Sequence, residues 1–391
     1  MKQSESNIEI SVVMPCLNEQ ETIGLCVWKA KTFLYEHGIN GEVIVADNGS
    51  TDDSVQIARK LNARVVHAHY KGYGNALYHG ISNAKGKYVL MADSDDSYEF
   101  LTIYPFLEKL REGYELVMGN RFKGKIHPKA MPWHHRYFGN PVLSFTGKLF
   151  FRAKIGDFHC GIRAFTKDAF QKMDMRTVGM EFASEIVVKS YLNKFKVAEI
   201  PVELFPDGRS GAPHLQSFND GWRHLRFLLM FSPRWLFLYP GTFMALFGAA
   251  LSLLILFNPD SNLDIHTMLY SSGLILAGAQ AAIFSIFSRI FAYHEGLIPS
   301  TPKLMKALKK LTLEKILIFG GLLILAGLAF FGYIAKMWLD GTFWQVGITI
   351  TVRYVITSVT LLILGFQSIF SGFFINILML KTHKRKHNER K

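Results

Sequence analysis

The chain has 391 residues, 44 lysines and arginines against 31 aspartates and glutamates, and a formal net charge of +13. This length suffices for two domains, and three cysteines without a CxxC pair argue against a disulfide framework, which favours a reducing compartment. The basic charge fits either nucleic acid or an anionic membrane surface, but much of it flanks hydrophobic segments, so we expect a membrane and no nucleic acid.

The first half of the chain has the pattern of an α/β protein. The opening residues MKQSESNIEI contain no apolar stretch, so no secretory signal is expected. Apolar runs rich in β-branched residues then alternate with helical patterns. The predicted strands are IEISVVMP, GEVIVAD, ARVVHA, KYVLMAD and YELVMGN. Alternation at this spacing predicts parallel βαβ units in an α/β sheet.

Polar side chains follow most of these strands. Pro15, Asn18 and Glu19 come after the first strand and Asp47 ends the second. The sequence DSDD comes after the fourth strand and Arg121 after the fifth. Ligands of such sheets bind beyond the carboxyl ends of the strands, so we expect these groups to converge on one edge.

The DSDD sequence places Asp93, Asp95 and Asp96 within four positions. Like charges this close repel, and burying one of them is costly. A divalent cation relieves the repulsion. Mg²⁺ and Mn²⁺ prefer oxygen ligands, and Mg²⁺ is commonly held by one or two carboxylates together with substrate phosphates. The crowding therefore suggests a nucleotide diphosphate site that uses a metal.

The second half of the chain predicts a membrane domain. A spanning helix needs about 20 mostly apolar residues. Four successive segments meet this condition, at about 235–257, 268–291, 316–338 and 354–380. Two further stretches, 215–231 and 301–315, carry an apolar face beside basic residues and are predicted to lie in the membrane interface.

Basic residues predict the orientation of these spans. The loop within 301–315 is rich in lysine, and the tail KTHKRKHNERK, 381–391, is also basic. Basic loops remain cytoplasmic, and an even number of spans returns the C-terminus to the side of the N-terminal domain. We therefore expect a multi-pass protein whose catalytic domain and both termini are cytoplasmic. Arg353 is expected at a segment end, where its side chain could reach the interface.

With these motifs together, residues 8–215 resemble the GT-A glycosyltransferases of family 2. The resemblance rests on four stretches: MPCLNEQETIG, ADNGSTDDS, KGYGNALYHGISNAKGKYVLMADSDD and GNRFKG. Within the family the sequence looks most like the dolichyl-phosphate mannose or glucose synthase group. The resemblance implies metal-dependent, inverting transfer of a sugar from a UDP- or GDP-sugar to a membrane polyprenyl phosphate.

The implied architecture is a Rossmann-like, mostly parallel GT-A domain followed by an all-α transmembrane domain. The expected divisions are a GT-A domain 1–212, a linker with an interfacial helix 213–234, four spans within 235–380 and the basic tail 381–391. The four spans are compatible with anchoring alone, with a homo-oligomer or with a flippase partner.

The resemblance also implies donor-side roles. Asp47 would contact the base, and Pro15, Asn18, Glu19 and Gly74 would help to form the nucleotide pocket. Asp95 would ligate Mg²⁺ or Mn²⁺, and Asp93 would contact the ribose or the metal. Asp96 is treated as a neighbour only, and Ser97 stands where relatives carry a further ligand.

On the acceptor side, arginine is expected because its planar fork matches phosphate oxygens. The candidates are Arg121, Arg136, Arg163 and Arg209, with Glu185 or Glu181 bonding sugar hydroxyls. Two structural alternatives stay open at this point. Arg163 could have the purely structural role of pairing with Asp157. Glu185 could be a charge on a helix surface.

Other functions are also compatible with these motifs. A processive polysaccharide synthase would carry Q-x-x-R-W, whereas this chain has FSPRW with Phe231 in place of the glutamine. Transfer to another lipid or glycan acceptor would need the same donor site. A non-catalytic protein that binds nucleotide sugar beside a flippase would also retain the donor motifs.

Overall fold

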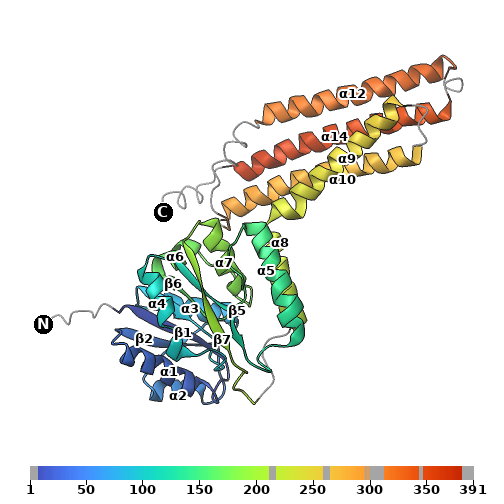
Figure 1. Ribbon diagram of the computed structural model, residues 1–391. Coiled ribbons are helices and arrows are strands. Elements are labelled where there is room, and N and C mark those ends of the chain that lie inside the picture. The colour runs from blue at the N-terminus through green and yellow to red at the C-terminus, as the bar shows by residue number, and fades with distance from the viewer. Residues whose placement is uncertain are drawn as a thin grey trace. The chain divides into compact units, whose positions relative to one another are not determined.

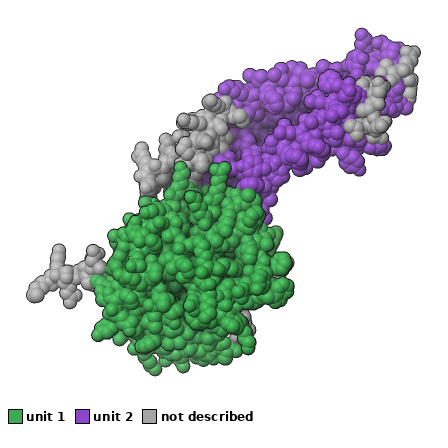
Figure 2. Space-filling model, viewed as in Figure 1, with its two compact units in different colours: residues 1–228 green, residues 229–391 purple. Residues whose placement is uncertain are grey.

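The computed structural model describes residues 8–210, 217–258, 265–295, 297–298, 312–342 and 347–380. The chain separates into two compact units, Met1–Leu228 and Leu229–Lys391, coloured separately in Figure 2. The boundary falls within the segment 213–234 that the sequence assigns to a linker. Most of the predicted interfacial segment 301–315 and the tail 381–391 lie outside the described residues.

Unit 1 is an α/β domain built on one sheet (Figure 1). Among its described residues the sheet has seven strands in the order β3-β2-β1-β4-β6-β5-β7. Only β6 runs antiparallel to its neighbours β4 and β5. The strands are β1 (Ile10–Cys16), β2 (Gly41–Asp47), β3 (Arg64–His67), β4 (Tyr88–Met91), β5 (Leu116–Ile126), β6 (Arg163–Thr166) and β7 (Val197–Leu204). The prediction of a mostly parallel, GT-A-like sheet is confirmed.

Helices cover both faces of the sheet because strand side chains alternate between the faces. Val12 and Met14 pack with α1 on one face. Val13 points to the opposite face, where α3 packs through Gly80, at which a Cβ would lie 2.7 Å from Val13. The helices of unit 1 are α1 (Ile23–Glu36), α2 (Ser54–Lys60), α3 (Tyr73–Ser82), α4 (Tyr104–Arg111), α5 (Asn140–Phe151), α6 (Lys167–Met173), α7 (Phe182–Leu192) and α8 (Ser217–Met230), with a 3₁₀ turn η1 (Phe100–Thr102).

Parallel pairing brings several strand ends to one edge of the sheet. Cys16 at the end of β1 pairs with Asp47 at the end of β2. Across the antiparallel β6, Arg163 faces both Met91 of β4 and Met118 of β5. The loops that follow β1, β2 and β4, and the middle of β5, therefore share the carboxyl edge.

A stripe of exposed apolar side chains runs along the π-helical turn η2 (His135–Gly139) and α5. Trp133 is 69% exposed, Phe138 64% and Phe145 65%. Tyr137, Val142 and Leu149 are exposed as well. Such a contiguous exposed apolar surface is typical of a protein or membrane contact. The sequence pattern predicted only Arg136 from this stretch as a candidate, and the apolar stripe is apparent only from the exposure of its side chains.

Unit 2 consists mainly of long apolar helices. Among its described residues, four are long and apolar enough to cross a membrane: Arg234–Phe257, Ile265–His294, Leu313–Leu339 and Ile348–Met379. The first comprises the π-helical turn η3 (Arg234–Leu238) and α9 (Tyr239–Phe257), and the others are α10, α12 and α14. Each overlaps a predicted span, so the prediction of four transmembrane helices is confirmed.

Arg353 lies in the second turn of α14, near a segment end as expected, but the expectation that its side chain reaches the interface is wrong. Its side chain is buried within unit 2, with 3% of the residue exposed, and it donates a hydrogen bond to the Ile255 carbonyl at 3.0 Å. The sequence could not reveal this acceptor, because it belongs to a different helix.

Glycines allow two helices of unit 2, α12 and α14, to pack closely. A Cβ at Gly320 would lie 2.9 Å from the Gly365 carbonyl, and one at Gly365 would lie 2.8 Å from the Gly320 carbonyl. Small residues allow helix backbones to pack closely where lipid supplies no hydrophobic driving force. Gly321, the next residue, has open space at its Cβ position.

We expect Gly320→Leu to destabilise unit 2 by at least about 1–3 kcal/mol, because the side chain overpacks the α12–α14 contact. Gly321→Leu is the matched control and should leave the melting temperature within about 1–2 °C of the parent. Thermal unfolding of the full chain in detergent measures both. Equal melting temperatures for the two variants would contradict the assigned contact.

Candidate active site

A cluster of carboxylates surrounds one guanidinium at the carboxyl edge. Arg209 Nη1 lies 2.9 Å from Glu19 Oε1, and Arg209 Nη2 lies 3.7 Å from Asp95 Oδ2. Asp207 holds the same guanidinium from its own loop. Residues from the loops after β1, β4 and β7 are thus joined through one cation. Asp207 was not among the predicted residues.

The electrostatics of the cluster favour bound positive charge. Burial raises the pKa of Glu19 to about 7; the Asp95 charge adds to this, and Arg209 opposes it. Burial and the Asp95 charge raise the pKa of Asp93 to about 6. Raised carboxyl pKa values mean that negative charge is incompletely compensated, so an added cation would be stabilised here.

Asp93 is oriented by two groups that contact its carboxylate. Tyr73 donates its hydroxyl to Asp93 Oδ1 at 2.9 Å. Gly161 leaves room for the other oxygen, since a Cβ there would lie 2.2 Å from Asp93 Oδ2. The glycine of the sequence DFHCGIRAF is therefore needed for close approach to Asp93. Tyr73 was missed, and a tyrosine beginning the helix after β3 gave no distinct signal.

The side chains of Asp95 and Asp96 have different partners because of the backbone conformation between them. Asp95 accepts hydrogen bonds from the Ser97 amide at 3.1 Å and hydroxyl at 2.6 Å. Asp96 has φ 60° and pairs with Lys29 at 2.8 Å. The left-handed conformation directs the two side chains to different partners, and Asp96 is engaged by a structural ion pair.

The loop after β2 is held by Asp47. Its carboxylate accepts hydrogen bonds from Gly49 and Ser50 amides at 3.3 and 3.0 Å, and lies 2.9 Å from His67 Nδ1. Burial alone would raise the pKa of Asp47, but these hydrogen bonds outweigh it and lower the pKa below its usual value. Asp47 is therefore ionised and shapes this loop.

The remaining donor-side residues also connect loops at this edge. Asn18 accepts from the Thr51 amide at 2.8 Å. The Pro15 carbonyl accepts from Ser94 Oγ at 2.6 Å. Gly74 packs so closely against the 177–182 loop that a Cβ would lie 2.8 Å from the Gly179 carbonyl. These contacts position the loops that surround the cluster.

Arg121 is fixed by a bidentate ion pair. Its Nε and Nη2 donate to the two oxygens of Asp157 at 2.7 and 2.8 Å. The pair is buried, with Asp157 0% exposed. Nη1 has no hydrogen-bond partner among the described residues, so one side of the guanidinium remains able to donate.

The alternative in which Arg163 pairs with Asp157 is wrong, because Arg121 occupies that carboxylate. Arg163 is fully buried and donates instead to the Ala183 and Cys160 carbonyls. Its Nε has no partner among the described residues. Arg163 thus fixes two backbone segments near Asp93 and contributes positive charge there.

Glu185 is not a surface charge, and that alternative is also wrong. It is fully buried and accepts from the Arg176 and Thr177 amides, and it pairs with Lys189 at 2.8 Å. Both of its oxygens are engaged in fixing a loop. Glu181, by contrast, has a buried oxygen without a partner among the described residues.

Arg136 lies apart from these ion pairs. It is exposed on η2, with its guanidinium 5.7 Å from the Tyr137 ring, beside the apolar stripe of α5. No carboxylate pairs with it in the described part of the chain. The structure gives no contact between Arg136 and the Asp93–Asp95 region.

The cluster fits a divalent metal only in combination with a substrate. Within the described ranges no three His, Cys, Asp or Glu side chains are grouped so as to hold a metal ion alone. Asp93 and Asp95 can supply two carboxylates, and a nucleotide diphosphate can supply further oxygens, as Mg²⁺ sites commonly require. The raised pKa of Asp93 agrees with such a site.

Comparison with known proteins identifies the family. Residues 11–174 match the model of glycosyl transferase family 2, and residues 286–379 match the C-terminal transmembrane region of family 2 glycosyltransferases. The hexosyltransferase Agl6 of low-salt glycan biosynthesis in Haloferax volcanii is 35% identical over 374 residues, covering 94% of this chain and 89% of Agl6. The chain belongs to glycosyl transferase family 2.

Two further relatives of this family 2 glycosyltransferase carry a lipid phosphate in their names. A dolichyl-phosphate hexose transferase of Haloferax volcanii is 28% identical over 214 residues, 54% of this chain and 89% of that protein. A dolichyl-phosphate beta-glucosyltransferase of Saccharomyces cerevisiae is 25% identical over 229 residues, 51% of this chain and 68% of that protein.

A buried histidine, His224, and a half-buried one, His159, pack beside Arg163 in this glycosyltransferase domain. Ser184 Oγ lies 2.9 Å from His224 Nδ1 and 3.2 Å from His159 Nε2. Burial lowers the pKa of His224 to about 4, and the Arg163 charge adds to the effect. The folded state therefore holds this imidazole neutral, whereas the unfolded chain protonates it below about pH 6.5.

We expect this histidine to make stability depend on pH. Its contribution is fully present above about pH 6.5 and is lost as the pH falls toward 4, by about 3 kcal/mol at most. In His224→Asn the difference in melting temperature between pH 7 and pH 4.5 should shrink. His69→Gln, at an exposed histidine, is the control, and equal pH dependence of the two variants would contradict the assignment.

Proposed function

We propose that this enzyme transfers a sugar from a nucleotide diphosphate sugar to a membrane polyprenyl phosphate. The observation that carries the proposal is the set of carboxylates Asp93, Asp95 and Glu19 at the carboxyl edge of a family 2 domain. The chain also carries four helices able to span a membrane. The names of the dolichyl-phosphate relatives support a lipid phosphate as acceptor.

Asp95 and Asp93 would hold Mg²⁺ or Mn²⁺ together with the diphosphate of the donor. A bound divalent ion acts as a Lewis acid that stabilises negative charge on the leaving diphosphate. Tyr73 and Gly161 keep Asp93 in one orientation, and Ser97 does the same for Asp95. Arg209 keeps a positive charge beside these carboxylates.

The nucleoside part of the donor would lie against the loops after β1 and β2. Asp47 keeps its loop in shape through three contacts and would present that loop to the base. Asn18, Pro15 and Gly74 hold the neighbouring segments. UDP- and GDP-sugars are both candidate donors.

The acceptor phosphate would be positioned by arginine. A lipid phosphate oxygen is already ionised near neutral pH and needs no strong general base. Arg121 offers Nη1 while Asp157 fixes its plane, and Arg209 and Arg136 are further candidates. Arg163 acts through the backbone that it holds, and Glu181 is better placed than Glu185 to bond a sugar hydroxyl, since one of its oxygens is free.

We also propose the cytoplasmic side for the catalytic domain and both termini. The basic segment 301–315 and the tail 381–391 support this orientation through the distribution of lysine and arginine. The exposed apolar stripe of α5, flanked by basic residues, supports action close to a membrane surface.

We expect purified protein to convert a nucleotide sugar and undecaprenyl or dolichyl phosphate into a polyprenyl-phosphate sugar, detected by product mass. Asp95→Asn should lower kcat at least 100-fold, because it removes a carboxylate that would ligate the metal bound to the donor diphosphate. Asp96→Asn is the matched control and should stay within about threefold, since that side chain pairs with Lys29.

Four results would contradict the proposal. Full activity of Asp95→Asn, or activity that survives exhaustive chelation, would exclude the metal role. Nucleotide-sugar binding without any transfer by the parent protein would instead favour a non-catalytic partner of a flippase. Long glycan products would favour a processive synthase.

The stereochemistry of the product provides a separate test. Direct attack by the lipid phosphate on the anomeric carbon is a single displacement, so we expect inversion of configuration. NMR coupling constants of the sugar phosphate determine the anomer. Retention would contradict direct displacement, and the Asp96→Asn product serves as a control for assay artefacts.

A further inference from the structure

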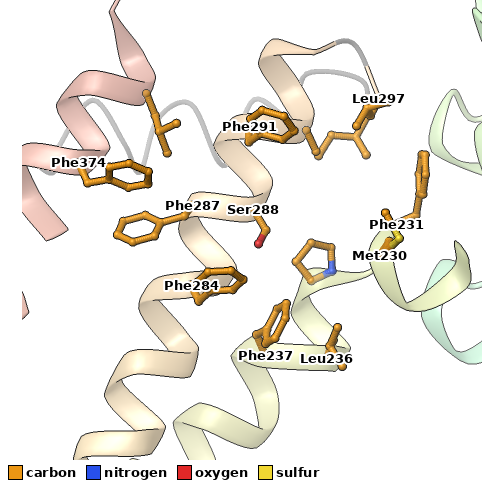
Figure 3. Close-up of a pocket in the computed structure, with 14 residues that line it drawn as sticks. Met230, Phe231, Leu236, Phe237, Phe284, Phe287, Ser288, Phe291, Leu297 and Phe374 are labelled. Atoms are coloured by element: carbon orange, nitrogen blue, oxygen red, sulfur yellow. The ribbon is translucent and has the colours of Figure 1, made fainter. Parts of the chain in front are cut away.

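An apolar pocket lies within unit 2 between η3, α10 and α14. Its volume is about 480 Å³, within the range of small-molecule binding sites. Six phenylalanines line it, as Figure 3 shows for all of them: Phe231, Phe237, Phe284, Phe287, Phe291 and Phe374. Ser288 contributes the hydroxyl that points inward.

Direct contacts hold the walls of this pocket together. Ser285 Oγ donates to the Pro233 carbonyl at 3.1 Å, which ties η3 to α10. The Phe237 and Phe284 rings are 5.1 Å apart, and the Phe287 and Phe374 rings 4.7 Å apart, both edge to face. The cavity is therefore preformed in unit 2.

Two arginines lie beside the pocket. Arg234 follows the lining residue Pro233, and Arg289 follows the lining residue Ser288. Arg289 is one helical turn from Ser285, the residue bonded to Pro233, so it is on the side of α10 that faces η3. The two guanidinium groups are close enough to repel each other.

Neither arginine has a hydrogen bond or carboxylate partner among the residues that the structure describes. Arg289 is half-buried and Arg234 is exposed. Cationic side chains within a membrane segment are costly and usually mark a binding site or pathway. Two neighbouring guanidiniums beside an apolar cavity suit an anion with an apolar tail.

The number of negative charges on the headgroup decides which anionic lipid matches two arginines. A phosphate monoester carries about 1.5–2 negative charges at pH 7, as a phosphorylated side chain does. A phosphodiester headgroup such as that of phosphatidylglycerol carries one. Two guanidiniums match the monoester, and their planar forks suit phosphate oxygens. Six aromatic rings and one hydroxyl suit a hydrocarbon chain rather than a polar ligand.

We propose that Arg234, Arg289 and the apolar pocket form a binding site for a polyprenyl phosphate, with the phosphate at the arginines and the isoprenoid chain in the pocket. The identity of this lipid rests on the proposed function, in which the acceptor is a polyprenyl phosphate, a phosphate monoester. The site is formed by residues of unit 2 alone, whereas Arg121, Arg163 and Arg209 belong to unit 1.

The test measures binding to the full chain in detergent by native mass spectrometry, with undecaprenyl phosphate as the probe. We expect Arg234→Gln/Arg289→Gln to raise the Kd at least tenfold. Arg223→Gln/Arg226→Gln removes the same charge from α8 and is the matched control, expected within twofold of the parent. Ala292→Trp, which fills the pocket, should also raise the Kd at least tenfold.

Three results would overturn the proposal. The first is unchanged binding in the Arg234/Arg289 double variant. The second is equal loss of binding in the Arg223/Arg226 control, which indicates general attraction by positive charge. The third is displacement of undecaprenyl phosphate by an equal concentration of phosphatidylglycerol, which indicates a site for bulk anionic lipid. UDP and GDP binding, measured in parallel, should be unchanged in every variant.

Transfer kinetics separate this inference from the proposed function. If the double variant raises KM for undecaprenyl phosphate but leaves KM for the nucleotide sugar unchanged, both stand. If the parent binds the lipid through the two arginines but transfers no sugar to it, the proposed function fails alone. If transfer proceeds with unchanged lipid binding and KM in the double variant, this inference fails alone.

Discussion

The active site depends on the repulsion between carboxylates that parallel strands bring to one edge. Glu19 and Asp95 follow different strands, and both face Arg209. Without the guanidinium, their burial would leave uncompensated negative charge, which proteins avoid by protonation or by binding cations. Burial raises the pKa values of Glu19 and Asp93, and the charge of Asp95 adds to both shifts. Under the proposed function, this negative charge would attract a cation carried by an anionic substrate.

The surrounding residues hold the charged side chains of the active site in fixed positions. Tyr73 and Gly161 restrict Asp93 from two sides, one by a hydrogen bond and the other by leaving space. Arg121 and Asp157 form a buried pair nearby, and such a pair costs desolvation that only good geometry offsets. A buried ion pair is therefore better understood here as a device that orients Arg121 than as a source of stability.

The sequence was sufficient where a local pattern determines the structure. Alternating apolar runs predicted the sheet, and long apolar segments predicted the four membrane helices. The strand-end residues Glu19 and Asp95 could be placed on one edge because parallel strands end together. The sequence was insufficient where partners are distant along the chain. The sequence suggested Arg163 as a partner of Asp157, whereas Arg121 forms that pair, and the burial of Glu185 depends on a loop that folds back from Arg176.

Charged side chains in unit 2 also need partners that are distant along the chain. An unpaired charge costs more free energy in a membrane-spanning helix than in a water-exposed domain. Arg353 is buried and donates to a helix carbonyl, so its position is explained by the fold itself. Arg234 and Arg289 have no comparable acceptor in the described residues, and the charge of Arg234 repels that of Arg289. Packing does not explain them, because a leucine at either position would avoid the penalty. A bound dianion does explain them, since it would convert two unfavourable charges into a pair of charge-assisted hydrogen-bond donors.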